Sequence, residues 1–320
     1  MQIMRVFKLI ALFTSLSFLS ALPITNAVAA NKAGLTIVTY NLANYNDHNS
    51  WEERLELIAN EIEAAHADVV ALQEVLLDPK QSSSKLTYQN MAEQLLYKLN
   101  QRGDFLEATL VTQPVMYYPT NLDDHLGTHQ YPLPASLSAH HQSYYWEGLS
   151  IIAKPMILET GGYFLSMPAD CGDTNKRVTQ YAKLLKSGQI YNIANVHFAY
   201  ATPCAVLNAS ETIDYLERVL PKNEPAFIAG DFNEKPDSPI FDLIRDHDYT
   251  DAWQTLRPND PGYTSNSEHP YKRIDYIWVN SAARAYLGNA EQIRLIGNHA
   301  TDGLYPSDHY GIALTLAEQH

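Results

Sequence analysis

Six short polar motifs in this sequence stand at the ends of apolar segments, where α/β proteins gather their functional groups. They are Thr39-Tyr40-Asn41, Leu72-Gln73-Glu74-Val75, Asn195-Val196-His197, Gly230-Asp231-Phe232-Asn233, Arg273-Ile274-Asp275 and Ser307-Asp308-His309. Each motif supplies a carboxylate, an amide or an imidazole. One such motif alone is typical of a strand end or a turn. Six of them along one chain indicate a functional site.

These residue types suit the hydrolysis of a phosphodiester by water. An imidazole oriented by a carboxylate is a base that works near neutral pH, and a second imidazole can serve as the acid. Carboxylate and amide oxygens favour a hard cation such as Mg²⁺, which stabilises charge on the phosphoryl group. The sequence has neither a Cys and His cluster with zinc spacing nor the Gly-x-Ser-x-Gly motif of a nucleophilic serine.

Strands and helices alternate along the chain and would position these motifs. β-branched and aromatic runs predict strands at 35–41, 68–75, 145–153, 163–167, 177–185, 189–197, 226–229, 273–279, 291–296 and 309–316. Apolar residues at helical spacing predict helices at 51–65, 88–99 and 210–220. Hairpins mixed with strand–helix units predict mixed sheets covered by helices, in one α/β domain.

The stretch 113–143 stands apart because it holds four Pro and four His without a clear period. We interpret it, with its continuation to residue 145, as a long surface insertion that contacts lipid or stacks on bases. The spacing of its histidines fits no helix face, so we expect solvated loop side chains and not a second metal site.

The N-terminal thirty residues have the layout of a secretory signal. Arg5 and Lys8 precede an apolar run at 9–22, and small residues follow near Ala29 and Ala30. The alternative is a membrane anchor, but the run is shorter than the roughly 20 residues of a span. We expect a signal peptide at 1–30, a mature domain at 31–320, and a periplasmic or secreted monomer without a transmembrane segment.

Charge and cysteine content bear on partners and compartment. The formal net charge of -14 disfavours a stable complex with nucleic acid, which normally needs a basic face, although it does not exclude one local anion site. Cys171 and Cys204 could form one disulfide in an exported protein, or remain two free thiols.

As a set, the motifs resemble the endonuclease/exonuclease/phosphatase superfamily of metal-dependent phosphoesterases. The matching pieces follow the family's order over nearly the whole mature chain, and they include EGLSII at 147–152. The resemblance implies a four-layer α/β sandwich, in which two mixed β-sheets pack face to face with helices outside. It also implies a hydrolase with one site at a shared edge of the sheets.

The resemblance assigns roles to ten residues. Glu74 matches the metal-binding residue, and Asn41 and Asp308 match residues that hold the same Mg²⁺ directly or through water, with Mn²⁺ or Ca²⁺ as substitutes. His309 matches the group that handles the proton of the attacking water, although Asp231 remains an alternative base. Asp231 and Asn233 match the pair that orients the water and binds the phosphoryl oxygens. The other matching residues are Asp275, which orients His309; His197, which binds phosphate or protonates the leaving oxygen; Glu147, beside His197; and Arg177, which contacts phosphate.

Three of these residues have simpler alternatives. Asp275 could form an ion pair with Arg273, Glu147 could be an exposed residue before a strand, and Arg177 could pair with Asp173.

The substrate is a phosphodiester whose class the motifs leave open. The placement of Cys171 and Cys204 resembles the disulfide of secreted bacterial sphingomyelinases, which favours a lipid head group or another small phosphodiester. Two departures oppose this: the stretch 297–305 is too short for their exposed aromatic hairpin, and Glu147 is typical of the nucleases. A secreted deoxyribonuclease-like endonuclease is therefore the alternative, and a non-catalytic binding protein on the same fold ranks last.

Overall fold

The computed structural model describes residues 34–44, 51–77, 89–119, 129–130 and 144–317. All of them belong to one compact unit, Ala33–His320. The predicted signal peptide, and His125, His140 and His141 of the predicted insertion, lie outside the described residues. No helix in the described part of the chain combines the length and the hydropathy that crossing a membrane requires.

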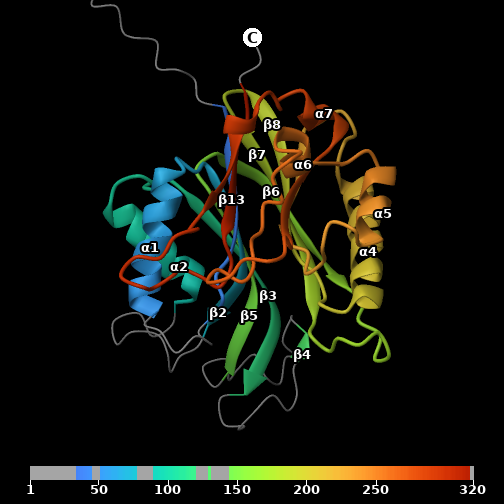
Figure 1. Cartoon of the computed structure of the whole chain (residues 1–320), viewed down its shortest axis with the longest axis horizontal. Helices are drawn as coiled ribbons and strands as arrows, with labels where there is room; N and C mark the ends of the chain where they lie inside the picture. The colour runs from blue at the N-terminus through green and yellow to red at the C-terminus, as the bar shows by residue number, and fades with distance from the viewer. Residues whose placement is uncertain (1–33, 45–50, 78–88, 120–128, 131–143, 318–320) are drawn as a thin grey trace, which may run out of the picture. The chain divides into compact units, whose positions relative to one another are not determined.

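The described strands form two mixed sheets (Figure 1). The first sheet has the order β12-β13-β1-β2-β5-β3-β4, with only β1 and β2 parallel, and the second has the order β10-β11-β9-β8-β7-β6, with only β8 and β9 parallel. The strands of the first sheet are β1 (Thr36–Asn41), β2 (Val69–Leu77), β3 (Thr109–Pro119), β4 (His129–Gln130), β5 (Tyr144–Ala153), β12 (Ile293–Ile296) and β13 (Gly311–Thr315). Those of the second are β6 (Met156–Leu165), β7 (Arg177–Lys186), β8 (Gln189–His197), β9 (Ala226–Asp231), β10 (Thr250–Asp251) and β11 (Asp275–Val279).

The central strands of each sheet are buried on both faces, which makes the predicted sandwich. Alternation along β1 shows how: Ile37 packs between the two sheets, whereas its neighbour Val38 packs on the outer face of the first. Between the sheets, Ile37 shares one core with Ile193 of β8 and Phe227 of β9. The expected four-layer α/β architecture is confirmed.

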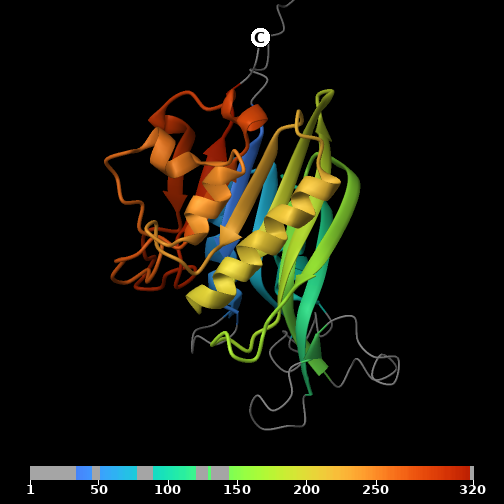
Figure 2. The ribbon, with the colours of Figure 1, turned by 90° about the vertical axis from the view of Figure 1, so that its right-hand side faces the viewer.

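Helices cover the two outer faces. α1 (Trp51–Ala64) and α2 (Met91–Gln101) pack on the first sheet, and α4 (Thr202–Val219) and α5 (Ile240–Asp246) pack on the second. Figure 2 shows α4 running across the strands of the second sheet. The short elements α6 (Ala252–Leu256), α7 (Ser281–Arg284) and η2 (Ala290–Gln292) complete the described part.

Three elements differ most from the predictions. β3 was not predicted as a strand, and its residues 113–119 fall in the stretch that we assign to the insertion; its register shifts at Pro114, where a residue without an N–H is tolerated. β6 begins at Met156 and not near 163. The prediction missed its first half because this edge strand exposes much of its length and lacks a clear apolar pattern. α4 begins at Thr202, eight residues early, with Pro203 in its first turn.

Candidate active site

The polar strand ends of both sheets meet at one edge of the sandwich. In the second sheet, Asp231 at the end of β9 is in register with His197 on β8 and Asp275 on β11. Asn41, at the end of β1 in the first sheet, donates from Nδ2 to Asp231 Oδ2 at 3.0 Å. Hydrophobic packing between the sheets therefore brings together residues that are 190 positions apart in the sequence.

A bulge in β2 turns Glu74 toward this edge. The pairing of β2 with β5 shifts register between Leu72 and Val75, and Glu74 adopts a φ of +52°. Its carboxylate accepts hydrogen bonds from Asn41 Nδ2 at 3.1 Å and from Asn44 Nδ2 at 3.0 Å. Burial and the neighbouring Glu147 raise the pKa of Glu74 to about 8.

His309 and Asp275 form a buried ion pair. Nδ1 of His309 lies 2.9 Å from Oδ2 of Asp275, and both side chains are almost fully enclosed. Burial alone would lower the pKa of His309, but Asp275, and then Asp231 and Asp308, raise it to about 10. His309 therefore carries its proton, and a positive charge, at neutral pH.

Asp231 lies between the two imidazoles. Its Oδ2 is 3.7 Å from His197 Nε2 and 3.9 Å from His309 Nε2, and its Oδ1 accepts the backbone N–H of Asn233 at 2.8 Å. Burial and Asp275 raise the pKa of Asp231 to about 6, so it is ionised above that pH. Burial, Arg177 and His309 lower the pKa of His197 well below its usual value, which leaves a neutral imidazole.

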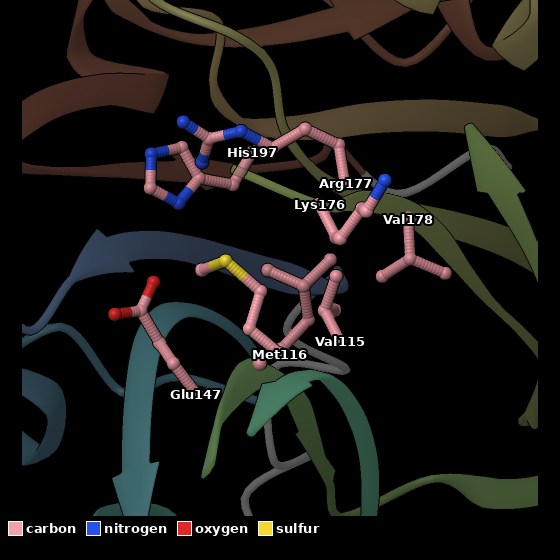
Figure 3. A pocket seen from close by; sticks show the side chains of 9 residues that line it. Val115, Met116, Glu147, Lys176, Arg177, Val178 and His197 are labelled. Atoms are coloured by element: carbon pink, nitrogen blue, oxygen red, sulfur yellow. The ribbon is translucent and has the colours of Figure 1, made fainter. Parts of the chain in front are cut away.

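Arg177 and Glu147 face each other across the site (Figure 3). The guanidinium of Arg177 lies beside the ring of His197, and the carboxylate of Glu147 projects from the opposite side next to Met116. Arg177 NH2 also pairs with Asp173 Oδ2 at 3.2 Å. Burial raises the pKa of Glu147, and Arg177 opposes that rise.

A cavity of about 450 Å³ lies over these groups. Eight of the ten predicted residues line it, and the other two, Asn41 and Asp275, contact lining residues through the hydrogen bonds to Asp231 and His309. The lining residues are Ala43, Asn44, Glu74, Met116, Glu147, Asn175, Arg177, His197, Tyr200, Asp231, Asn233, Asp308 and His309. The structure thus places all ten predicted site residues at one edge.

The simpler alternatives for three of these residues have different outcomes. Arg273 pairs with Asp251 at 2.7 Å, so it is not the partner of Asp275. Glu147 lines the cavity and is not merely an exposed residue before a strand. Arg177 does pair with Asp173, as the alternative proposed, and it lines the cavity as well.

Sequence reasoning missed several cavity residues. Asn44 bonds to Glu74, and Asn175 and Tyr200 line the wall near Arg177. Tyr200 is 57% exposed and follows His197 by three residues, a proximity that could have flagged it. The same proximity applies to Asn44, three residues after Asn41, and to Asn175, two residues before Arg177.

The donor atoms of the cavity suit a hard divalent cation. Glu74 and Asp308 present carboxylates to it, and burial together with the charge of Glu147 raises the pKa of Glu74, a cost that a bound cation would offset. Asn41 Nδ2 donates to Glu74, and Asn41 Oδ1 accepts the N–H of Ala43 at 2.9 Å, which leaves the second lone pair of that oxygen for a cation or its water. A second group in the described part, Asp231, Asp275 and His309, has possible ligand atoms within 4.8 Å of one another.

Cys171 and Cys204 form a disulfide, which settles the alternative of two free thiols. It joins the segment before β7 to the first turn of α4.

Comparisons with known proteins agree with this architecture. No curated protein matches the sequence. Among solved structures, an endonuclease/exonuclease/phosphatase family protein from Leptotrichia buccalis aligns with a TM-score of 0.65 at 19% identity, covering 89% of this chain and 100% of that one. D. rerio TDP2 complexed with single strand DNA product gives 0.59 at 19% identity, covering 89% and 99%.

Another solved structure of similar fold is the mannosyl-6-phosphatase Bt3783 of Bacteroides thetaiotaomicron. It has a TM-score of 0.59 at 17% identity, covering 89% of this chain and 100% of that one. At these identities the structures show a shared fold. The family model described as Endonuclease/Exonuclease/phosphatase family matches residues 38–309, most of the sequence. The chain therefore belongs to this family, whose members are hydrolases that act on phosphoester bonds.

Proposed function

We propose that the protein is an exported, Mg²⁺-dependent phosphodiesterase. The observation that carries the proposal is the position of Asp231 Oδ2, which faces the imidazoles of His197 and His309 at 3.7 and 3.9 Å on the floor of an open cavity. A carboxylate between two imidazoles, one charged and one neutral, supplies the base and the donors that attack of water on a phosphoryl group needs.

The charges of the three groups suggest their roles. His309 is held protonated by Asp275, so it suits stabilisation of a negatively charged phosphoryl oxygen better than proton abstraction. The sequence left two candidates for the group that accepts the proton of water, His309 and Asp231. Asp231 is ionised at neutral pH and is therefore the better proton acceptor. The neutral imidazole of His197 has an N–H for the phosphoryl or leaving oxygen, and the backbone N–H of Asn233 orients Asp231.

Glu74, Asp308 and Asn41 would hold the metal ion, directly or through water, and Asn44 would fix the carboxylate of Glu74. When bound there, Mg²⁺ supplies charge stabilisation and polarises the phosphoryl group. Mn²⁺ or Ca²⁺, which also prefer oxygen ligands, are candidate substitutes.

Two substrate classes fit this site. The cysteine arrangement favours a lipid head group or another small phosphodiester, as in the sphingomyelinases that it resembles. The placement of Glu147 in the cavity supports the second candidate, a secreted nuclease, because that residue was the nuclease-like feature of the sequence. The predicted signal peptide at 1–30 and the disulfide support export in either case.

The test is a parallel assay of the purified mature protein with Mg²⁺ and with EDTA. Bis(p-nitrophenyl) phosphate, sphingomyelin, phosphatidylcholine and supercoiled plasmid serve as substrates, with His309→Ala as the control variant. We expect metal-dependent cleavage of the chromogenic diester and of one natural class, reduced about 10²- to 10⁴-fold in the variant. Absence of cleavage in every arm, or full activity of the variant, would refute the proposal.

A further inference from the structure

Asp173 is a buried carboxylate for which the proposed mechanism has no role. Its side chain is fully enclosed, and its two oxygens accept three hydrogen bonds. Oδ2 accepts from Arg177 NH2 and from the backbone N–H of Tyr200, both at 3.2 Å, and Oδ1 accepts from the backbone N–H of Asn175 at 2.8 Å. One carboxylate thus connects three residues from two separate segments.

Those three residues form one wall of the catalytic cavity. Asn175, Arg177 and Tyr200 all line it, whereas Asp173 lies behind them. Because Asp173 binds Tyr200 and Asn175 through their backbones, it fixes the turn after β8 against the segment before β7. The wall is therefore organised around a single buried charge.

The disulfide holds this charge in place from the other side. Cys171 lies two residues before Asp173, and its Sγ contacts the backbone oxygen of Asp173 at 3.9 Å. Its partner Cys204 is fully buried in the first turn of α4, just after Tyr200. Both segments that Asp173 connects are consequently covalently joined within a few residues of it.

Arg177 is the group on this wall that can bind an anion. Only 5% of the residue is exposed, and no hydrogen-bond partner for its buried Nε is found among the described residues. Its charge acts on both His197 and Glu147, which places it beside the reacting groups. A guanidinium has five N–H donors, so one bond to Asp173 leaves donors for a phosphoryl oxygen.

We propose that Asp173 is a positioning residue that holds Arg177 and Tyr200 as a preformed wall for the phosphoryl group and its adjoining substituent. Asp173 acts through Arg177 by fixing the orientation of its guanidinium, and through Tyr200 by fixing the turn that presents the exposed ring. The inference deepens the proposed function and rests on it for its kinetic arm. It also makes a prediction about anion binding that does not require turnover.

Asp173→Asn tests the role because it keeps the shape and removes the charge. We expect the Kd for inorganic phosphate, measured by calorimetry in EDTA, to rise about 10-fold, because a guanidinium that Asp173 no longer orients loses one charge-assisted hydrogen bond to phosphate. The KM for bis(p-nitrophenyl) phosphate should rise by a similar factor, with kcat within about threefold. Tyr200→Ala should raise the KM for a bulkier diester but leave the Kd for phosphate unchanged.

Asp251→Asn is the matched control. Asp251 also forms a buried ion pair, with Arg273 at 2.7 Å, and also accepts a backbone N–H, from Gln254. It lies outside the catalytic cavity. Both variants should melt at lower temperature, but only Asp173→Asn should weaken phosphate binding. Equal effects of the two variants on phosphate binding would overturn the positioning role.

A double-mutant cycle with Arg177→Ala then separates positioning from general destabilisation. If Asp173 acts on phosphate through Arg177, adding Asp173→Asn to Arg177→Ala changes the Kd for phosphate little further. Full additivity would overturn the proposal. If Asp173→Asn does not fold, Asp173→Glu displaces the charge by one methylene and should weaken phosphate binding in the same direction, whereas unchanged binding would overturn it.

The phosphate-binding and the kinetic measurements together distinguish a failure of this inference from a failure of the proposed function. If phosphate binding depends on both Arg177 and Asp173 but no diester is cleaved, the proposed function is contradicted and the positioning role of Asp173 is supported. If diesters are cleaved and the KM of Asp173→Asn equals that of the wild type, the proposed function is supported and the positioning role of Asp173 is contradicted.

Discussion

Asp275→Asn is the substitution that separates the charge of the His309 pair from its geometry. An asparagine can still accept the Nδ1–H of His309 at the observed 2.9 Å, so the orientation of the ring is kept. The negative charge that most raises the pKa of His309 is lost, and burial then lowers that pKa. We expect kcat on bis(p-nitrophenyl) phosphate to fall about 10²- to 10³-fold, the range for loss of one group that stabilises developing negative charge.

The same substitution changes the pH dependence of stability. The pKa of His309 is about 10 in the folded protein and near 6.5 when unfolded, so its stabilising contribution is complete below pH 6.5 and is lost as the pH rises to 10. Glu74, with a folded pKa of about 8, is half titrated at pH 8, and because both proteins contain it, its contribution is common to the two profiles. Between pH 8 and 10 the wild type should therefore lose up to about 3 kcal/mol more than the variant, since one proton is worth about 1.4 kcal/mol per pH unit.

Urea unfolding in EDTA at pH 8, 9 and 10 measures this difference, and initial rates with Mg²⁺ measure kcat. Asp251→Asn is again the control, because it removes a buried charge from an ion pair of which neither member lines the catalytic cavity. It should lower the free energy of unfolding at every pH, but it should keep the wild-type dependence of that free energy on pH and the wild-type kcat. Parallel pH profiles of Asp275→Asn and the wild type, or an unchanged kcat, would refute the reasoning.

Further predictions concern the metal, a close backbone approach and the disulfide. Glu74→Gln should weaken Mg²⁺ binding at least about 10-fold in calorimetry, because it removes a carboxylate from the proposed ligands. Gly230→Ala should lower the free energy of unfolding by at least about 1–3 kcal/mol, since its Cβ would lie 2.0 Å from the backbone oxygen of Val196. Gly188→Ala is the comparison, because its Cβ would meet nothing within 4 Å. Its free energy of unfolding should fall only by the strain that a φ of +84° imposes on alanine. Replacing Cys171 and Cys204 together by Ser should lower the free energy of unfolding by about 3–4 kcal/mol, the chain-entropy value for a 33-residue separation, and a loss below 1 kcal/mol in urea would contradict it.

Much of the fold was predictable because most strands in the core have strong local patterns. β8 was predicted at its observed bounds, since a turn signal precedes it and His197 ends its apolar run. β6 was predicted too short because an edge strand does not need to bury every second residue. Pro114 misled the interpretation of β3, because only the register of β5 shows that it lies at a bulge.

The site was predictable in composition but not in connectivity. The motifs named the residues at the strand ends, and the resemblance paired Asp275 with His309. No local pattern could show that Arg273 turns to Asp251, or that Asp173 connects Arg177 to Tyr200 from the next segment. Such contacts depend on how the segments after different strands meet, and the packing of two sheets fixes that.

Backbone strain is concentrated where the proposed chemistry takes place. Eight non-glycine residues in the described part have a positive φ, and half of them line the catalytic cavity: Ala43, Asn44, Glu74 and Asn233. Such a conformation costs about 1–3 kcal/mol at each residue. At Glu74 the strain accompanies the bulge that aims a carboxylate into the cavity, and at Asn233 it brings the backbone N–H to Asp231. The local departures from strand geometry thus coincide with the groups that must converge on one phosphoryl group, which is the pattern expected when function and not stability determines the backbone.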